Sequence, residues 1–168
     1  EWIDASDTIV SRLYLSVLAF LFPLIKFLLP NFLKSAREQT REMNNQALFA
    51  SLIFLPITAI GITGLLIFSN QIFFLLFNVD IHINYAQTVL FMSILPIVIS
   101  IIIGTSVKLA TGRETEIRSV IIRASPIMLL GMLAAVVFEH VLILYLTIFM
   151  FETYVAIQYV SDFIGDFR

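Results

Sequence analysis

The stretch ALFASLIFLPITAIGITGLLIFS, residues 47–69, decides the fold of this chain. It carries no charge, and it lies within a longer run, residues 43–79, that contains no Asp, Glu, Lys, Arg or His. An uncharged apolar run of 18 or more residues is typical of a helix that crosses a lipid bilayer. A transmembrane strand would be half as long and would alternate apolar with polar residues. The stretch therefore predicts a membrane-spanning helix.

Four further segments are also long and apolar, and each of them contains one or two charged residues. Of the 168 residues, 60% are hydrophobic and 13% are charged, whereas a soluble domain has about half and about a quarter, respectively. So few charged side chains cannot cover a water-facing surface of this size. We therefore expect an all-α membrane protein in which residues 1–168 form a single transmembrane domain. Its five helices are predicted at about 8–33, 47–69, 85–109, 120–138 and 141–160, with a short interfacial helix after Asn70.

The connections between these segments differ in their basic residues. Three occur in 34–46, four in 108–123 and one, Arg168, in the C-terminal tail, whereas 70–84 and the Glu139-His140 turn have none. Because Lys and Arg are retained on the cytoplasmic side of a membrane, we expect loops 34–46 and 108–118 and the C-terminus to be cytoplasmic. The odd number of spans and the first residue, Glu1, are interpreted as signs of a fragment.

Two of the connections carry signals of helix boundaries. Ser35-Ala36-Arg37-Glu38 fits a capping box, so we expect Ser35 to start a solvated helical turn. Gly112 is expected to end the third helix and Thr115 to start the fourth. Arg123 would then lie one turn into the fourth helix, where it is expected to stabilise the cytoplasmic end.

Two basic residues lie inside the first predicted helix. A charge at the centre of a bilayer costs about 2.5–3.5 kcal/mol, and it usually faces a bundle interior or an aqueous cavity. Arg12 is a candidate for lining a cavity that handles an anionic substrate; alternatively, it reaches the outer head groups or pairs with Asp4 or Asp7. Lys26 is a second cavity candidate, with snorkelling at the cytoplasmic boundary as its alternative.

Glu152 lies near the middle of the fifth predicted helix. It is a candidate for the proton-carrying carboxylate of a coupled transporter. Alternatively, it is a protonated or hydrogen-bonded group that holds helices together.

Small residues and prolines are expected to shape the helices. Each of the first four contains a proline, which removes a backbone hydrogen bond and permits a kink, and kinked helices suit alternating access. These prolines are Pro23, Pro56, Pro96 and Pro126. Gly131 and Ala135 form a small-xxx-small pair that predicts a close contact between helices.

The sequence lacks the motifs of several kinds of chemistry. It contains no Cys, which excludes disulfides, thiolate nucleophiles and cysteine-bound metals, and His82 and His140 lack metal-ligand spacing. No P-loop, GxGxxG motif or Ser/His/Asp constellation is present. We therefore expect no enzyme activity, no cofactor, no metal site and no nucleic-acid partner.

Six segments together resemble the O-antigen flippases, the polysaccharide branch of the multidrug/oligosaccharidyl-lipid/polysaccharide exporter superfamily. Residues 23–26, PLIK, are similar to a P-x-x-K stretch before a basic loop. Residues 72–78 are similar to an ending of the type ii-x-llfG, with Asn78 in place of the usual Gly. The fifth helix, with Glu152 followed by Gln158-Tyr159, is similar to the family's closing helix. The other similar segments are 55–56, 89–96 and 104–113.

This resemblance covers nearly the whole chain and implies the last five helices of a twelve-helix bundle in the bacterial cytoplasmic (inner) membrane. It implies translocation of an oligosaccharide, linked through diphosphate to a polyprenol, to the outer leaflet by alternating access. The implied partners are this lipid-linked oligosaccharide, membrane lipids and the remainder of the bundle. The family's cationic central cavity makes Arg12 the leading candidate for substrate binding and Lys26 the second, and Glu152 is the candidate for coupling.

Three other functions remain open. A drug/cation antiporter of the same superfamily would depend on a carboxylate, so that Glu152 rather than Arg12 would be essential. A membrane-embedded enzyme of glycan assembly, such as a polymerase, would need catalytic groups in its outer loops. The longest outer connection, 70–84, offers only Asp80 and His82 for that purpose. A purely structural membrane subunit is the third alternative.

Overall fold

The computed structural model describes residues 5–38 and 40–165, apart from the side chains of 5, 24–26, 36–38, 40, 101 and 102. Within these ranges the chain is helical and contains no strand. Its elements are α1 (Ala5–Glu38), α2 (Thr40–Ile67), α3 (Ser69–Phe77), α4 (Tyr85–Met92), α5 (Ile94–Ile97), the π-helix η1 (Val98–Gly104), α6 (Thr105–Ala110), α7 (Glu114–Phe138) and α8 (Val141–Gly165).

Within the described residues, five helices are long and apolar enough to cross a membrane. They are Ser6–Ser35, Arg41–Ile67, Tyr85–Ala110, Glu114–Phe138 and Val141–Gly165, and the third of them combines α4, α5, η1 and α6. The predicted all-α fold with five membrane-spanning helices is therefore confirmed. Four of the predicted spans lie inside the observed helices, and the second extends past the end of α2.

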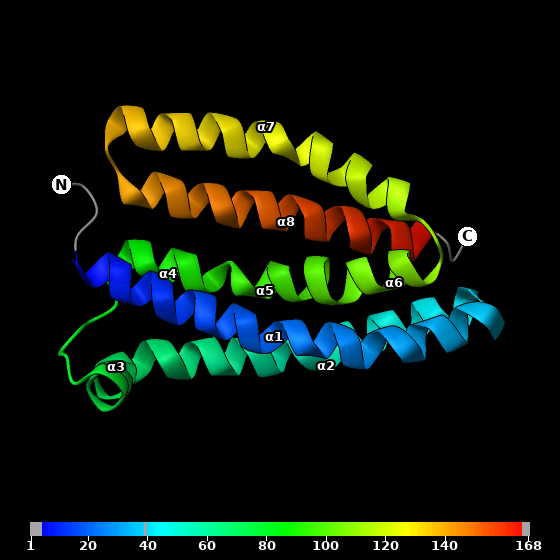
Figure 1. Cartoon of the computed structure of the whole chain (residues 1–168), viewed down its shortest axis with the longest axis horizontal. Helices are drawn as coiled ribbons and strands as arrows, with labels where there is room; N and C mark the ends of the chain where they lie inside the picture. Colours follow the sequence, from blue (N-terminus) through cyan, green and yellow to red (C-terminus); the bar gives the residue numbers. More distant parts are fainter. Residues whose placement is uncertain (1–4, 39, 166–168) are drawn as a thin grey trace.

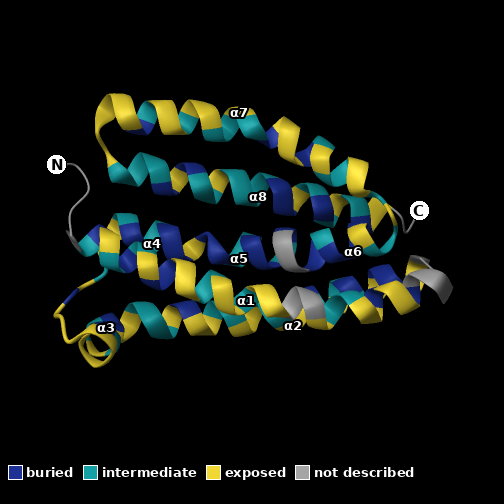
Figure 2. Ribbon diagram, in the orientation of Figure 1, coloured by how far each residue is buried: buried dark blue, intermediate teal, exposed yellow. Residues whose placement is uncertain are grey.

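The third span lies at the centre of the bundle. In its most apolar stretch 56% of the residues are buried, against 11–22% in the other four spans. Figure 1 shows α4, α5 and α6 between α8 on one side and α1 and α2 on the other, with α7 outermost. The exposed faces of α2 and α7 stand out in Figure 2. The third span therefore has protein on most of its surface, which lets it hold polar groups that lipid would not tolerate.

The outermost helix, α7, is attached to the bundle mainly through α8. Gly131 makes their close approach possible, because a Cβ at this position would overlap the side chain of Thr147. Ala135, one turn further along α7, is buried. The contact predicted from the pair of small residues is therefore confirmed.

The connections rich in basic residues lie at one end of the bundle. Figure 1 shows the α1–α2 hairpin, the α6–α7 turn and the last turn of α8 at the right-hand end. The segment around α3 and the α7–α8 turn lie at the left-hand end. This grouping agrees with the alternation of basic and non-basic connections along the sequence, and the compartment that each end faces stays a prediction.

The apolar residues after Asn70 form the separate helix α3, which Figure 1 shows end-on while α2 lies lengthwise. The helix ends at Asn78, whose φ of 54° is left-handed and whose N–H donates to the carbonyl of Phe74. Asn and Gly adopt this conformation most readily at the end of a helix. Asn78 therefore occupies a backbone position that favours Asn or Gly.

Three local predictions are wrong. Ser35 lies inside α1, where its Oγ donates to Gln46 Oε1 at 2.8 Å, so it joins the two helices of the first hairpin instead of starting a turn. Gly112 does lie in the turn that follows the third span, as expected, and its φ of 69° is left-handed. However, the turn is tight enough for α7 to begin at Glu114, before Thr115. Arg123 therefore lies more than two turns into α7 rather than one.

Candidate functional site

The candidate site lies where the third span departs from α-helical geometry. Pro96 has no N–H, so it cannot donate to the carbonyl of Met92, four residues earlier. Shortly afterwards, Val98–Gly104 forms a π-helix, in which the Thr105 N–H donates to the Ser100 carbonyl, five residues back. Short π-helical segments inside α-helices occur frequently at functional sites. This one lies in the middle of the most buried span of the chain.

The π-helix is in close contact with α8. A Cβ at Gly104 would overlap the ring of Tyr159, so the backbone of η1 approaches the aromatic side chain directly. On the same side of the third span, Ser100 Oγ donates to Glu152 Oε2 at 2.9 Å. The contact between the two helices therefore includes one polar pair in the middle of the predicted membrane-spanning region.

Glu152 is a half-buried carboxyl group, and its donor Ser100 is fully buried. None of the ion pairs formed by the described residues includes Glu152. A carboxylate in apolar surroundings is costly to keep charged unless a cation or several donors stabilise it. The carboxyl group of Glu152 is therefore chemically suited to take up and release a proton or a cation.

Two buried polar contacts connect α1 to the third span nearer the end without basic residues. Tyr14 Oη lies 3.1 Å from Ser93 Oγ. Asp7 Oδ1 accepts hydrogen bonds from Gln87 Nε2 at 2.9 Å and from Tyr145 Oη at 3.4 Å. A single buried carboxyl group therefore joins α1, α4 and α8.

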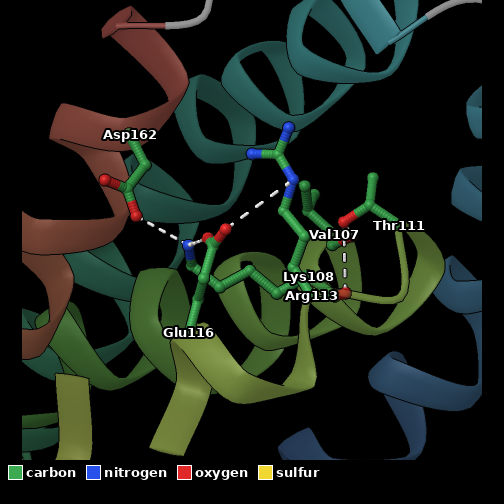
Figure 3. A network of polar contacts seen from close by, with 6 residues as sticks. All are labelled: Val107, Lys108, Thr111, Arg113, Glu116 and Asp162. Atoms are coloured by element: carbon green, nitrogen blue, oxygen red, sulfur yellow. Dashed lines mark hydrogen bonds and ion pairs between the residues drawn. The ribbon is translucent and has the colours of Figure 1, made fainter. Parts of the chain in front are cut away.

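Lys108 is the centre of a charged network at the opposite end of the bundle (Figure 3). Its Nζ lies 2.7 Å from Glu116 Oε2 on α7 and 2.6 Å from Asp162 Oδ2 on α8. Nζ also lies 5.4 Å from the centre of the Tyr159 ring, within the range of a cation–π interaction. Arg113 Nε lies 3.9 Å from Glu116 Oε1. The side chain of Lys108 is only 3% exposed, so its charge is compensated by protein rather than by water.

The structure does not bring the predicted site residues together. Arg12 is exposed on the outer face of α1, whereas Glu152 is on α8 and faces the third span. Asp7, considered as a partner of Arg12, instead accepts hydrogen bonds from Gln87 and Tyr145. The side chain of Lys26 lies outside the described part of the structure. The roles of Arg12, Lys26 and Glu152 therefore stay predictions.

An apolar groove of about 770 Å³ runs between α2, the third span and α8. It is lined mainly by hydrocarbon, including Leu55, Pro96 and Phe149. Thr153, which follows Glu152, also lines it, and its buried Oγ1 has no hydrogen-bond partner among the described residues. A groove of this size and character is suited to apolar ligands.

Within residues 5–38 and 40–165, no three His, Asp or Glu side chains are grouped closely enough to hold a metal ion. Comparison of the chain with protein-family models, with curated proteins and with solved structures found no match.

Several polar residues of the core were not predicted. The sequence pattern identifies Lys108 only as a basic residue of a connection, and it does not distinguish Gln87, Tyr145 or Asp162 from other polar residues. Apart from the local contact of Gln87 with Asn84, their side-chain partners given above lie between 8 and 138 residues away along the chain. One signal was present: Lys108 and Asp162 are charged residues close to the ends of apolar segments, where a partner is expected.

Proposed function

We propose that this chain forms part of a membrane transporter that works by alternating access. The observation that carries the proposal is the interrupted third span, which holds the Ser100–Glu152 pair at its π-helical segment. Irregular backbone at membrane depth is tolerated where it is buried in protein or lines a cavity, and transporters place their binding sites at such interruptions. Pro96 supplies a flexible point beside it.

The proposed substrate is an oligosaccharide linked through diphosphate to a polyprenol, moved from the cytoplasmic to the outer leaflet of the bacterial inner membrane. The sequence resemblance to O-antigen flippases supports this substrate. A further support is Arg12, a cation on an exposed face of α1. In a larger bundle this face would line the cavity that receives the diphosphate, because intramembrane charges usually face a cavity. The apolar groove would suit the polyprenol chain.

Substitution of Arg12 tests the proposed substrate. In proteoliposomes containing the intact transporter, a fluorescent polyprenyl-diphosphate sugar should become accessible to a membrane-impermeant quencher. Arg12→Ala should slow this translocation at least tenfold, because it removes the guanidinium fork that binds phosphate. The control is Arg118→Ala, which removes an exposed arginine from α7. Normal translocation by Arg12→Ala would remove this residue from the site.

The second candidate function is exchange of a drug or other organic cation for protons. The observation that favours it is Glu152, a carboxyl group in a predicted membrane-spanning helix. Among the described residues, its one hydrogen bond is donated by Ser100. Glu152→Gln should abolish proton-driven cation uptake by proteoliposomes, because Gln keeps an acceptor for Ser100 but cannot bind a proton. Glu114→Gln, at the exposed start of α7, is the matched control. Cation exchange that depends on Glu152 and not on Arg12 would favour the antiporter over the flippase.

A further inference from the structure

A polar groove of about 510 Å³ lies between the beginning of α7 and the end of α8. It adjoins the apolar groove, with which it shares Ser161 and Gly165, and neither Ser100 nor Glu152 lines it. The side chains that could donate hydrogen bonds into it are Arg113, which directly precedes α7, Ser119 and Arg123 from α7, and Gln158 and Ser161 from α8.

The spacing of these residues explains why they share one groove. On α7, Glu116, Ser119 and Arg123 are separated by three or four residues, which places them on one face of the helix, and Arg113 lies directly before its first residue. On α8, Gln158, Ser161 and Asp162 follow the same rule. Because α7 packs against α8 along its length, the two faces oppose each other at the end of the bundle that carries the α6–α7 turn.

The charge of the groove is positive when its ion pairs are considered. Its two carboxylates, Glu116 and Asp162, both lie within 2.7 Å of the buried ammonium group of Lys108. Arg113 also contacts Glu116. Arg123 is different: within residues 5–38 and 40–165 it has no ion pair and no side-chain hydrogen bond. The groove therefore presents an uncompensated guanidinium group beside two hydroxyls and an amide.

The position of Arg123 along α7 places it at the level of lipid head groups. It lies about 13 Å along the helix from Glu114, at 1.5 Å per residue. The 15 residues from 124 to 138 that follow it carry no charge. Its neighbours Ile121 and Ile122 are 47% and 68% exposed, so this part of α7 faces lipid. An arginine here is just inside the edge of the hydrocarbon and within reach of a phosphate.

We propose that this groove binds the phosphate of an anionic phospholipid from the leaflet on the side of the α6–α7 turn. The planar guanidinium of Arg123 would bind the phosphate through two parallel hydrogen bonds, and Ser119, Gln158 and Ser161 would donate to its remaining oxygens or to the head-group alcohol. Basic pockets between membrane helices are suited to such head groups. The bound lipid would join the beginning of α7 to the end of α8. This inference does not depend on the proposed transport function.

Native mass spectrometry of the detergent-purified full chain tests the proposal. The protein is mixed with phosphatidylglycerol or phosphatidylcholine of the same acyl chains, and the bound lipid is counted. We expect phosphatidylglycerol to be retained preferentially. Arg123→Gln should weaken its binding about tenfold, as expected for the loss of a charge-assisted hydrogen bond. Arg123→Lys, which keeps the charge but loses the fork, should have a smaller effect.

Arg118→Gln is the matched control, because Arg118 is exposed on α7 and does not line the groove. Phosphatidylglycerol binding by Arg118→Gln should equal that of the wild type, and both variants should keep the thermal unfolding midpoint. Equal retention of the two lipids, or undiminished binding by Arg123→Gln, would overturn the proposal. Displacement of the lipid by millimolar inorganic phosphate would identify a free anion site and would overturn the lipid assignment.

Discussion

Lys108 illustrates how a charged residue is accommodated at the end of a membrane-spanning helix. Its ammonium group bridges the first turn of α7 and the last turns of α8, while its side chain is buried against Tyr159. Its two partners are about half exposed, with side-chain exposures of 45% and 42%. The lysine therefore depends on the carboxylates more than they depend on it, because water can solvate them but not the buried ammonium group.

Replacing Lys108 should destabilise the bundle. Lys108→Met keeps an unbranched side chain, one atom shorter than lysine, but leaves Glu116 and Asp162 without their common cation. We expect the free energy of unfolding to fall by about 2 kcal/mol, less than for a fully buried pair because water screens both carboxylates. Thermal unfolding in detergent measures the effect, with the exposed Lys34→Met as control. An unchanged stability would mean that the network contributes nothing to holding α6, α7 and α8 together.

At the scale of the element, the third span is a helix whose regular geometry is interrupted where it packs against α8. The interruption combines Pro96, the π-helix η1 and Gly104, and the last of these allows the ring of Tyr159 to contact the backbone. Interhelical packing in membranes depends on such small residues, since lipid competes equally well for large apolar ones. The contact of η1 with α8 should therefore be sensitive to a single methyl group.

Gly104→Ala tests this sensitivity. We expect the free energy of unfolding to fall by about 1–3 kcal/mol, the usual effect of adding a methyl group to a tightly packed contact. Gly64→Ala is the control, because a Cβ at Gly64 meets nothing within 4 Å and alanine favours a helix. The pair of variants is compared by thermal unfolding in detergent. If both behave alike, the close contact between η1 and Tyr159 is not a determinant of stability.

At the scale of the whole molecule, the arrangement of the connections determines which residues share a side of the membrane. The α1–α2 hairpin and the α6–α7 turn lie at one end, and the segment around α3 lies at the other (Figure 1). Because the sequence contains no Cys, single cysteines can report the side directly. Acidic positions are suitable for this purpose, since Asp and Glu contribute little to topology.

Asp80→Cys should be labelled from outside intact cells by a membrane-impermeant maleimide. Glu42→Cys and Glu114→Cys should be labelled only after the cells are permeabilised, because the basic connections are expected to be cytoplasmic. The unmodified chain, which contains no Cys, is the background control. Labelling of Asp80→Cys and Glu114→Cys from the same compartment would contradict the five-span topology and, with it, the proposed transport function.

Sequence-based prediction fails where two interacting residues are on different helices. Ser35 matched a local capping pattern, but its hydroxyl bonds to Gln46 across the first hairpin. Asp7 was considered a partner of Arg12 on the same helix, and its partner Tyr145 is 138 residues away. A pattern in one segment does not contain the position of a residue on another helix, so neither contact could be predicted.

Several properties of this protein were determined by the sequence alone: its helical class, its five apolar segments and the alternation of its basic connections. They depend on the thickness of a bilayer and on the cost of moving a charge through it, and both act on each segment separately. Only the tertiary structure decided that the third span is central, that Ser100 meets Glu152 and that Lys108 is buried between two carboxylates. These contacts depend on which helix faces surround each residue, and packing across the whole chain sets those faces.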